Sequence, residues 1–294
     1  MTDTERTIAD PAIGAVALRV ADLARSLAFY TQRLGLALIE RSGEGAWGHA
    51  RLGTAERVLL ELQGAPGAPA AAPGTTGLYH FAILLPERSD LARFLAGALR
   101  ERLDFVGFAD HYVSEAAYLT DPDGNGIEIY ADRPRALWEG QVAQRMTTLP
   151  LDLESLLGEL GDQRAARYDA LPAGSVIGHV HLKVADIPST IAFYRDALGM
   201  ECTARLGSRA AFFSWGGYHH HIGANTWESA GGRAPDPAAT GLLATTLVVA
   251  EEARRTDMIA AVAGAGYAVA EGAGSVSLTD PAGNVLRIEQ GARD

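Results

Sequence analysis

The stretch Ile177–Met200, IGHVHLKVADIPSTIAFYRDALGM, decides the fold because it encodes a strand followed by a helix. Apolar residues occupy every second position over Val180–Val184, which is the period of a strand with one buried face. Asp186 is a favourable residue for the N-cap of a helix, and Gly199 is favourable at a helix C-terminus. The stretch therefore predicts a strand–helix unit.

The same unit occurs once before in the chain. Ile13–Leu36, IGAVALRVADLARSLAFYTQRLGL, is identical to it at 12 of 24 aligned positions, and its helix is expected to begin at Asp22. A second repeat relates Leu119–Tyr130 to Leu278–Glu289, where seven of 12 positions match around a turn sequence, DPxGN. Repetition at this scale predicts four βαβββ modules in two tandem halves. We expect an α+β fold whose curved mixed sheets form cups, with helices on their outer faces.

The repeats also set the expected boundaries. Two segments rich in Pro, Gly and Ala, Gly64–Gly77 and Glu228–Gly241, predict a linker within each half. The expected spans are a tail at 1–12, a first half at 13–133 with modules 13–63 and 78–133, a connector at 134–175, and a second half at 176–291 with modules 176–227 and 242–290.

Composition argues against several classes of partner. A formal net charge of −11 without a cationic stripe argues against nucleic acid and anionic membrane surfaces. No apolar run approaches the ~20 residues that span a bilayer, and the polar N-terminus is unlike a secretory signal. Cys202 is the only cysteine, which fits a reducing compartment. We expect a cytoplasmic protein that acts on a small molecule, alone or as a homo-oligomer.

Superposition of the four modules predicts a metal site. The inward position of the first strand is occupied, in order, by Ala17, His80, His181 and Ala244. After the DPxGN turn, the second module has Glu128 where the fourth has Arg287. Two histidines and a carboxylate on neighbouring strands form the facial triad of non-haem Fe(II) sites. Only a pairing of modules two and three completes this set, as His80, Glu128 and His181, without help from Glu61. We therefore expect one metal-binding cup there, and a metal-free cup from modules one and four.

At this point the sequence resembles a known family. The strand–AD–helix–FY–LG pattern, the DPDGNGIEIY ending and the four-module layout are similar to the vicinal oxygen chelate superfamily of glyoxalases, bleomycin-resistance proteins and type I extradiol dioxygenases. HFAILLPERSDLARFL, DHYVSEAAYLTDPDGNGIEIYADRP, IGHVHLKV and GYHHHIGANTW look like its CatE-like catechol-2,3-dioxygenase branch. The resemblance covers nearly the whole chain. It implies an oxidoreductase that opens the ring of a small aromatic diol with O2, using Fe(II) or alternatively Mn(II).

The resemblance also implies roles for individual residues. The family's metal ligands fall on His80, Glu128 and His181. The family's tyrosine, ten residues before the ligand glutamate, falls on Tyr118, and an upstream histidine matches His111. The acid–base histidine of an H-x-x-A strand matches His221, and alternation along that strand would place His219 on the same face for substrate contact.

Two other functions stay open at this point. A glyoxalase-like lyase or isomerase using Zn, Ni or Mn would need a fourth ligand, for which Glu61 is the one candidate. A binding or resistance protein would hold an aromatic ligand without turnover, with its histidines bonded to protein groups. The better-known extradiol enzymes build the triad from modules three and four, where this chain has Ala244 and Arg287. The dioxygenase interpretation therefore requires modules two and three to share a sheet.

Overall fold

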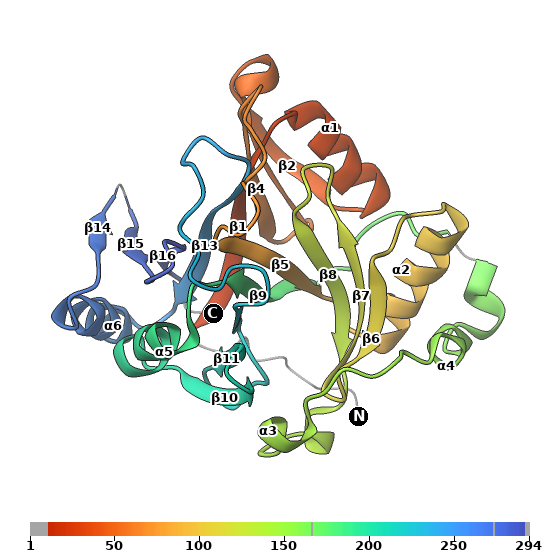
Figure 1. Ribbon diagram of the computed structural model, residues 1–294. Coiled ribbons are helices and arrows are strands. Elements are labelled where there is room, and N and C mark those ends of the chain that lie inside the picture. The colour runs from red at the N-terminus through yellow and green to blue at the C-terminus, as the bar shows by residue number, and fades with distance from the viewer. Residues whose placement is uncertain (1–10, 166, 273, 292–294) are drawn as a thin grey trace.

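The computed structural model describes residues 11–165, 167–272 and 274–291, and most of the expected tail, residues 1–10, lies outside them. The described chain forms two eight-stranded sheets (Figure 1). The first sheet has the order β14 (Val269–Glu271), β15 (Val276–Thr279), β16 (Val285–Gln290), β13 (Gly241–Val249), β1 (Ala12–Val20), β4 (Val58–Gly64), β3 (His49–Gly53) and β2 (Ala37–Ser42). The second has the order β10 (Glu201–Leu206), β11 (Ala210–Ser214), β12 (Ile222–Asn225), β9 (Val176–Lys183), β5 (Gly77–Leu84), β8 (Gly126–Asp132), β7 (Ser114–Thr120) and β6 (Gly107–Asp110).

This topology joins the modules as the sequence predicted. Modules one and four share the first sheet through the antiparallel pair β1–β13, and modules two and three share the second through β5–β9. Within each module, the last strand runs parallel to the first. The α+β fold of two tandem halves is confirmed, and the pairing that the dioxygenase interpretation requires is present.

The helices begin where the predicted caps lie. The Asp22 side chain accepts a hydrogen bond from the backbone of Arg25, and the Asp186 side chain accepts one from the backbone of Ser189. Gly199 ends the third module's helix with a φ of +77°, a conformation that glycine adopts without strain. The module helices are α1 (Leu23–Ala28) continued by the π-helix η1 (Phe29–Arg33), α2 (Arg88–Arg100), α5 (Ile187–Ile191) continued by the π-helix η5 (Ala192–Ala197), and α6 (Glu252–Gly264).

The segment between the halves and one hairpin carry short helices. These are η2 (Gly45–Trp47), η3 (Arg135–Leu137), α3 (Val142–Arg145), α4 (Leu153–Gly158) and η4 (Gly161–Ala165). Helix α4 lies beside α2 on the outside of the second sheet (Figure 1). No helix in the described part of the chain is long and apolar enough to cross a membrane.

Two buried hydrogen bonds tie modules together across the sheets. The Tyr30 hydroxyl, from η1 of module one, donates to Asp121 in the DPxGN turn of module two at 2.8 Å. The Tyr194 hydroxyl, from η5 of module three, donates to Asp280 in the corresponding turn of module four at 3.0 Å. Each bond therefore joins the two modules of one half across the two sheets.

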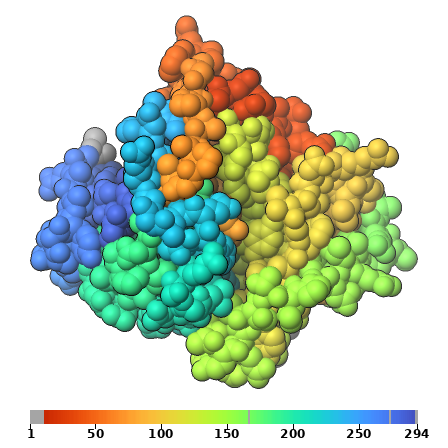
Figure 2. Space-filling view, in the orientation of Figure 1, coloured from red at the N-terminus to blue at the C-terminus, as the bar shows by residue number. Residues whose placement is uncertain are grey.

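The two Pro/Gly/Ala linkers contact each other. The backbone N–H of Thr76 donates to the carbonyl of Arg233 at 3.0 Å, and the N–H of Thr240 donates to that of Pro69 at 2.9 Å. In Figure 2 the orange and light-blue segments lie side by side on the surface. The linkers therefore bridge the halves as well as joining modules.

Candidate active site

The register of the central strands places three functional side chains on one face. In the antiparallel pair β5–β9, His80 lies opposite His181 and Ala82 lies opposite His179. Strand β8, on the other side of β5, places Glu128 beside Ala82. Since alternate residues of a strand share a face, these imidazoles and this carboxylate all emerge on the same side of the sheet.

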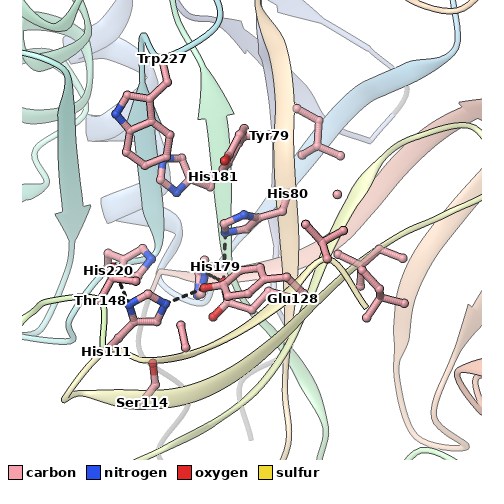
Figure 3. A pocket seen from close by; sticks show the side chains of 18 of the residues that line it. Tyr79, His80, His111, Ser114, Glu128, Thr148, His179, His181, His220 and Trp227 are labelled. Atoms are coloured by element: carbon pink, nitrogen blue, oxygen red, sulfur yellow. Dashed lines mark hydrogen bonds and ion pairs between the residues drawn. The ribbon is translucent and has the colours of Figure 1, made fainter. Parts of the chain in front are cut away.

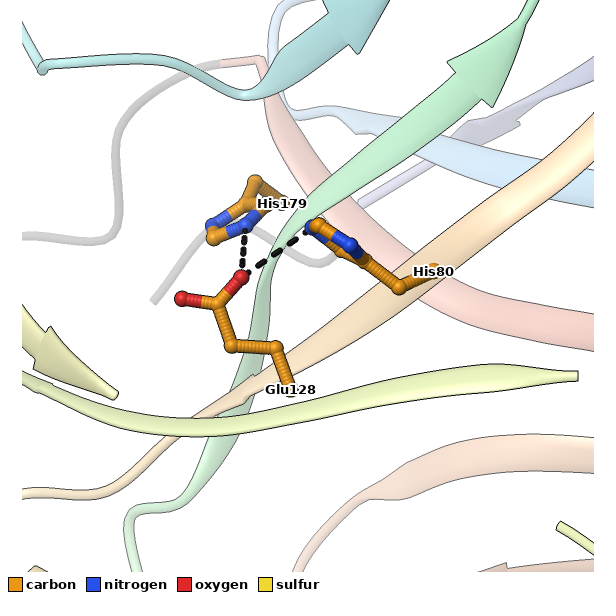
Figure 4. Close-up of side chains that lie close together, drawn as sticks. All are labelled: His80, Glu128 and His179. Atoms are coloured by element: carbon orange, nitrogen blue, oxygen red, sulfur yellow. Dashed lines mark hydrogen bonds and ion pairs between the residues drawn. The ribbon is translucent and has the colours of Figure 1, made fainter. Parts of the chain in front are cut away.

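Three of these side chains converge. Nε2 of His179 lies 3.0 Å from Oε2 of Glu128, and Nε2 of His80 lies 3.1 Å from the same oxygen (Figure 4). One potential ligand atom from each residue lies within 4.8 Å of the other two. The side chains are almost completely buried, with exposed fractions of 7% for His80, 2% for Glu128 and 1% for His179.

The structure brings His80 and Glu128 together as expected, but with His179 rather than His181. The two β9 histidines share a face, and His181 lies two residues further along the strand, about 7 Å away. The sequence does contain a signal for this difference. His80 stands seven residues before the helix N-cap Glu87, and His179 stands seven before the N-cap Asp186. Aligning the modules on their helix starts would have matched these two histidines.

The electrostatics of the three groups suit a cation. Burial alone would raise the pKa of Glu128, but His179 and His80 outweigh it and hold that pKa well below its usual range. Burial lowers the pKa of His179 to about 4, so its imidazole is neutral near pH 7. Despite the short distance, Nε2 of His80 has no partner with hydrogen-bond geometry, and Nδ1 of His179 has none. Two imidazoles and a carboxylate, with buried nitrogens unsatisfied, fit a divalent transition metal.

A cavity of about 710 Å³ opens above this cluster (Figure 3). Glu128, His111 and Ser114 lie toward one end in Figure 3, and Tyr79 and Trp227 toward the other. The apolar part of its wall includes Leu78, Val106, Phe108, Ala109, Val113, Leu119, Ile127, Met146, Leu206 and Phe212. The cavity therefore offers an aromatic and aliphatic surface next to His80, Glu128 and His179, which we call the triad.

Tyr118 and His111 form a hydrogen-bonded pair in the cavity wall. Nδ1 of His111 lies 2.7 Å from the backbone carbonyl of Thr147, which can only accept, so Nδ1 carries the proton. Nε2 of His111 then accepts a hydrogen bond from the Tyr118 hydroxyl at 2.6 Å. Burial raises the pKa of Tyr118 well above its usual value, and nearby Glu128 raises it further. Tyr118 is therefore a neutral phenol whose oxygen remains an acceptor.

The three consecutive histidines take different positions from those expected. His220 lines the cavity, with its ring centroid 4.1 Å from that of His179. His219 contacts Asp132 at 3.0 Å, and neither it nor His221 is among the described residues that line the cavity. Nδ1 of His221 accepts a hydrogen bond from the backbone N–H of Trp215 at 3.3 Å and lies 3.1 Å from the Ser214 hydroxyl.

The three histidines differ from the expected arrangement because of the local backbone structure. The histidine run precedes β12, which begins at Ile222, so strand alternation does not apply to it. Sequence reasoning therefore missed His220 as the cavity residue. Burial, with the neighbouring imidazoles adding to it, lowers the pKa of His220 well below its usual value.

Glu61 lies in the first sheet, away from the triad. Its carboxylate contacts Arg287 at 3.0 Å and Arg51 at 3.5 Å. In the same cup Ala17 faces Ala244 across the β1–β13 pair, so the second cup has alanines on its central strands where the first has imidazoles.

Similarity to known proteins identifies the family and the reaction class of this chain. The model of the Glyoxalase/Bleomycin resistance protein/Dioxygenase superfamily matches residues 12–129 and 176–288. The chain belongs to this superfamily. A relative from Bacillus subtilis (strain 168), catechol-2,3-dioxygenase, is 42% identical over 281 residues, which cover 92% of this chain and 94% of the relative. A match of this extent makes the chain an oxidoreductase of the dioxygenase kind, as the sequence predicted.

Solved structures share the fold. A putative dioxygenase from Bacillus subtilis subsp. subtilis str. 168 superposes with a TM-score of 0.65 at 13% identity, over 95% of this chain and 84% of that one. Glyoxalase I from Zea mays superposes with a TM-score of 0.60 at 16% identity, over 95% of this chain and 92% of that one. At these identities the two structures support the four-module architecture alone.

Proposed function

We propose that this protein is an Fe(II)-dependent extradiol dioxygenase that opens the ring of a catechol-type diol. The observation that carries the proposal is the convergence of His80, His179 and Glu128 beneath an aromatic cavity. A set of two histidines and one carboxylate leaves coordination positions open for substrate, as ring-cleaving chemistry requires. The dioxygenase relative, at 42% identity over nearly the whole chain, supports the same reaction class.

His80 and His179 would hold the metal through Nε2, and Glu128 through its carboxylate. Bound there, Fe(II) would supply the electron transfer between diol and O2 that precedes ring opening. The donor set favours Fe(II), with Mn(II) as the alternative, because imidazole suits iron whereas Mn(II) prefers oxygen ligands.

The surrounding side chains position the diol and move its proton. We assign His220 as the base that accepts a phenolic proton, because it lines the cavity beside His179. Its Nδ1 lies 2.8 Å from Nδ1 of His219, which leaves Nε2 for the cavity. The Tyr118 oxygen, whose proton is donated to His111, can accept a hydrogen bond from a substrate hydroxyl. The apolar wall limits water around the ring.

The competing functions have less support. A glyoxalase-like mechanism was expected to need Glu61 as a fourth ligand, and that carboxylate pairs with arginines in the other sheet. A non-catalytic aromatic-binding protein was expected to bond its histidines to protein groups. Nε2 of His80 and Nε2 of His181 are instead buried without hydrogen-bond partners.

The test is oxygen consumption by anaerobically prepared protein. The protein is loaded with Fe(II), desalted, and mixed with catechol while O2 uptake and the absorbance of the ring-fission product are followed. We expect one O2 consumed per diol and a yellow semialdehyde product. Iron binding without O2 uptake on any diol would favour a lyase or isomerase, and failure to bind iron would favour a binding protein.

A further inference from the structure

The cavity contains the only lysine of the 294-residue chain. Lys183 lies on β9, four residues after His179, and lines the same cavity. Even-numbered spacing places its side chain on the face that carries His179 and His181. At about 3.3 Å per residue, its backbone is roughly 13 Å from that of His179. Lys183 therefore stands at the end of the cavity away from the triad.

Lys183 has no charged partner in the part of the chain that the structure describes. No hydrogen bond or ion pair joins its ammonium to another described residue, although most arginines of the protein have such contacts. Glu228 is the other charged residue at this end of the cavity, but it is exposed and forms no ion pair with Lys183. The ammonium of this half-buried lysine, without a counter-ion among the described residues, is available to an anionic group of a ligand.

A second polar group faces the same space. His181 is 4% exposed, lines the cavity, and has no hydrogen-bond partner at Nε2. Its ring is held from behind by β12, where a Cβ on Gly223 would come within 2.9 Å of it. Tyr79 and Trp227 pack around it, with ring centroids at 5.3 and 5.6 Å (Figure 3). Buried polar atoms are rarely left unpaired, so a ligand is the natural partner for this nitrogen.

We propose that His181 and Lys183 recognise a carboxylate on the side chain of the substrate. The inference rests on the proposed function, and it narrows the substrate to catechols that carry a short acid side chain. The diol would lie at the triad, the ring and side chain would pass the aromatic residues Tyr79 and Trp227, and the carboxylate would reach Lys183. A cavity of about 710 Å³ lies in the range of sites for ligands larger than bare catechol.

The test compares two ligands that differ only in charge. Dihydrocaffeate, a catechol with a propionate side chain, is compared with its uncharged primary amide. Binding to the iron-loaded protein is measured anaerobically by calorimetry, and kcat/KM is measured by O2 uptake. We expect wild type to favour the acid by about tenfold or more, and Lys183→Met to bring the acid-to-amide ratio close to one. An unchanged ratio in Lys183→Met would overturn the proposal.

Two further variants make the result specific. Glu228→Gln removes the other charge at this end and should keep or increase the preference for the acid. If it abolished the preference as Lys183→Met does, recognition by Lys183 would be refuted. His181→Gln should weaken binding of the acid severalfold while the protein keeps its iron, and loss of iron would show that His181 is a metal ligand. If neither compound causes O2 uptake, the dioxygenase proposal fails, while calorimetry still decides the charge preference.

Discussion

His80 and His179 present Nε2 to the same oxygen of Glu128, at 3.1 and 3.0 Å, from strands that belong to different halves of the chain. Each stands seven residues before a helix N-cap, so the two are equivalent positions of the repeat. In modules one and four the positions at the same distance from the caps Asp22 and Glu251 are alanines. This repeated position is histidine in modules two and three and alanine in modules one and four. It therefore explains why the second sheet has two imidazoles beside Glu128 and the first sheet has none at these positions.

His220→Ala should retain iron and lose kcat/KM by about 10²–10⁴, because the variant removes the proposed base and leaves the triad intact. The control is His221→Ala, which lies outside the cavity. It should cost about 1–3 kcal/mol of unfolding free energy through the lost hydrogen bonds. Its loss of activity should be much smaller. A larger kinetic effect from His221→Ala than from His220→Ala would reverse the assignment of the base.

Tyr118→Phe should lower kcat by about 10² while iron content and fold stay the same, because it removes the hydroxyl that contacts His111 and faces the substrate site. Tyr168→Phe is a suitable control. That hydroxyl donates to the backbone of Leu34, and Tyr168 is not among the described residues that line the cavity. Equal activity of Tyr118→Phe and wild type in steady-state O2 uptake would remove Tyr118 from the mechanism.

Metal-free protein should lose stability as the pH falls below about 6.5, the pKa of histidine in an unfolded chain. Burial lowers the pKa of His221 to about 3 and that of His179 to about 4. Each imidazole therefore binds its proton in the unfolded state first. Its contribution to stability is complete above pH 6.5 and is lost toward pH 3–4, by about 1.4 kcal/mol per pH unit.

Urea unfolding between pH 7 and pH 5 measures this dependence. His221→Gln should reduce the slope by about one proton, because it removes one imidazole whose pKa burial lowers to about 3. Identical slopes for wild type and His221→Gln would contradict the prediction.

Tyr30→Phe and Tyr194→Phe should each lower the free energy of unfolding by about 1–3 kcal/mol, because each leaves a buried carboxylate with one hydrogen bond fewer. The two substitutions occupy equivalent repeat positions, so their effects should be similar. Tyr267→Phe, in a half-buried ring that packs on Phe193, is the control and should change stability by less than about 0.5 kcal/mol. If Tyr30→Phe and Tyr194→Phe lowered the free energy of unfolding no more than Tyr267→Phe does, these hydrogen bonds would not contribute to stability.

The repeats made most of the fold predictable. The repeated strand–helix sequence and the DPxGN turns indicated four modules. Asp22 and Asp186 indicated helix starts that the structure confirms. The absence of histidine from the first strands of modules one and four also indicated which modules had to share a sheet. Each of these features depends on a short stretch of residues, so it can be predicted from the sequence alone.

The exact triad was harder to predict because it depends on register between strands. His179 and His181 share a face, and periodicity alone cannot distinguish which of them lies beside Glu128. The β5–β9 register decides this, by placing His179 opposite Ala82. His220 was missed for a different reason, since alternation was applied to a segment that is irregular before β12.

Iron stoichiometry in His179→Ala and His181→Ala tests the central claim most directly. Each variant is loaded with Fe(II) without oxygen, desalted and analysed for metal, with circular dichroism as a check of folding. We expect about one iron per chain in wild type and in His181→Ala, and almost none in His179→Ala. Full iron in a folded His179→Ala, with loss of iron from His181→Ala, would contradict the account.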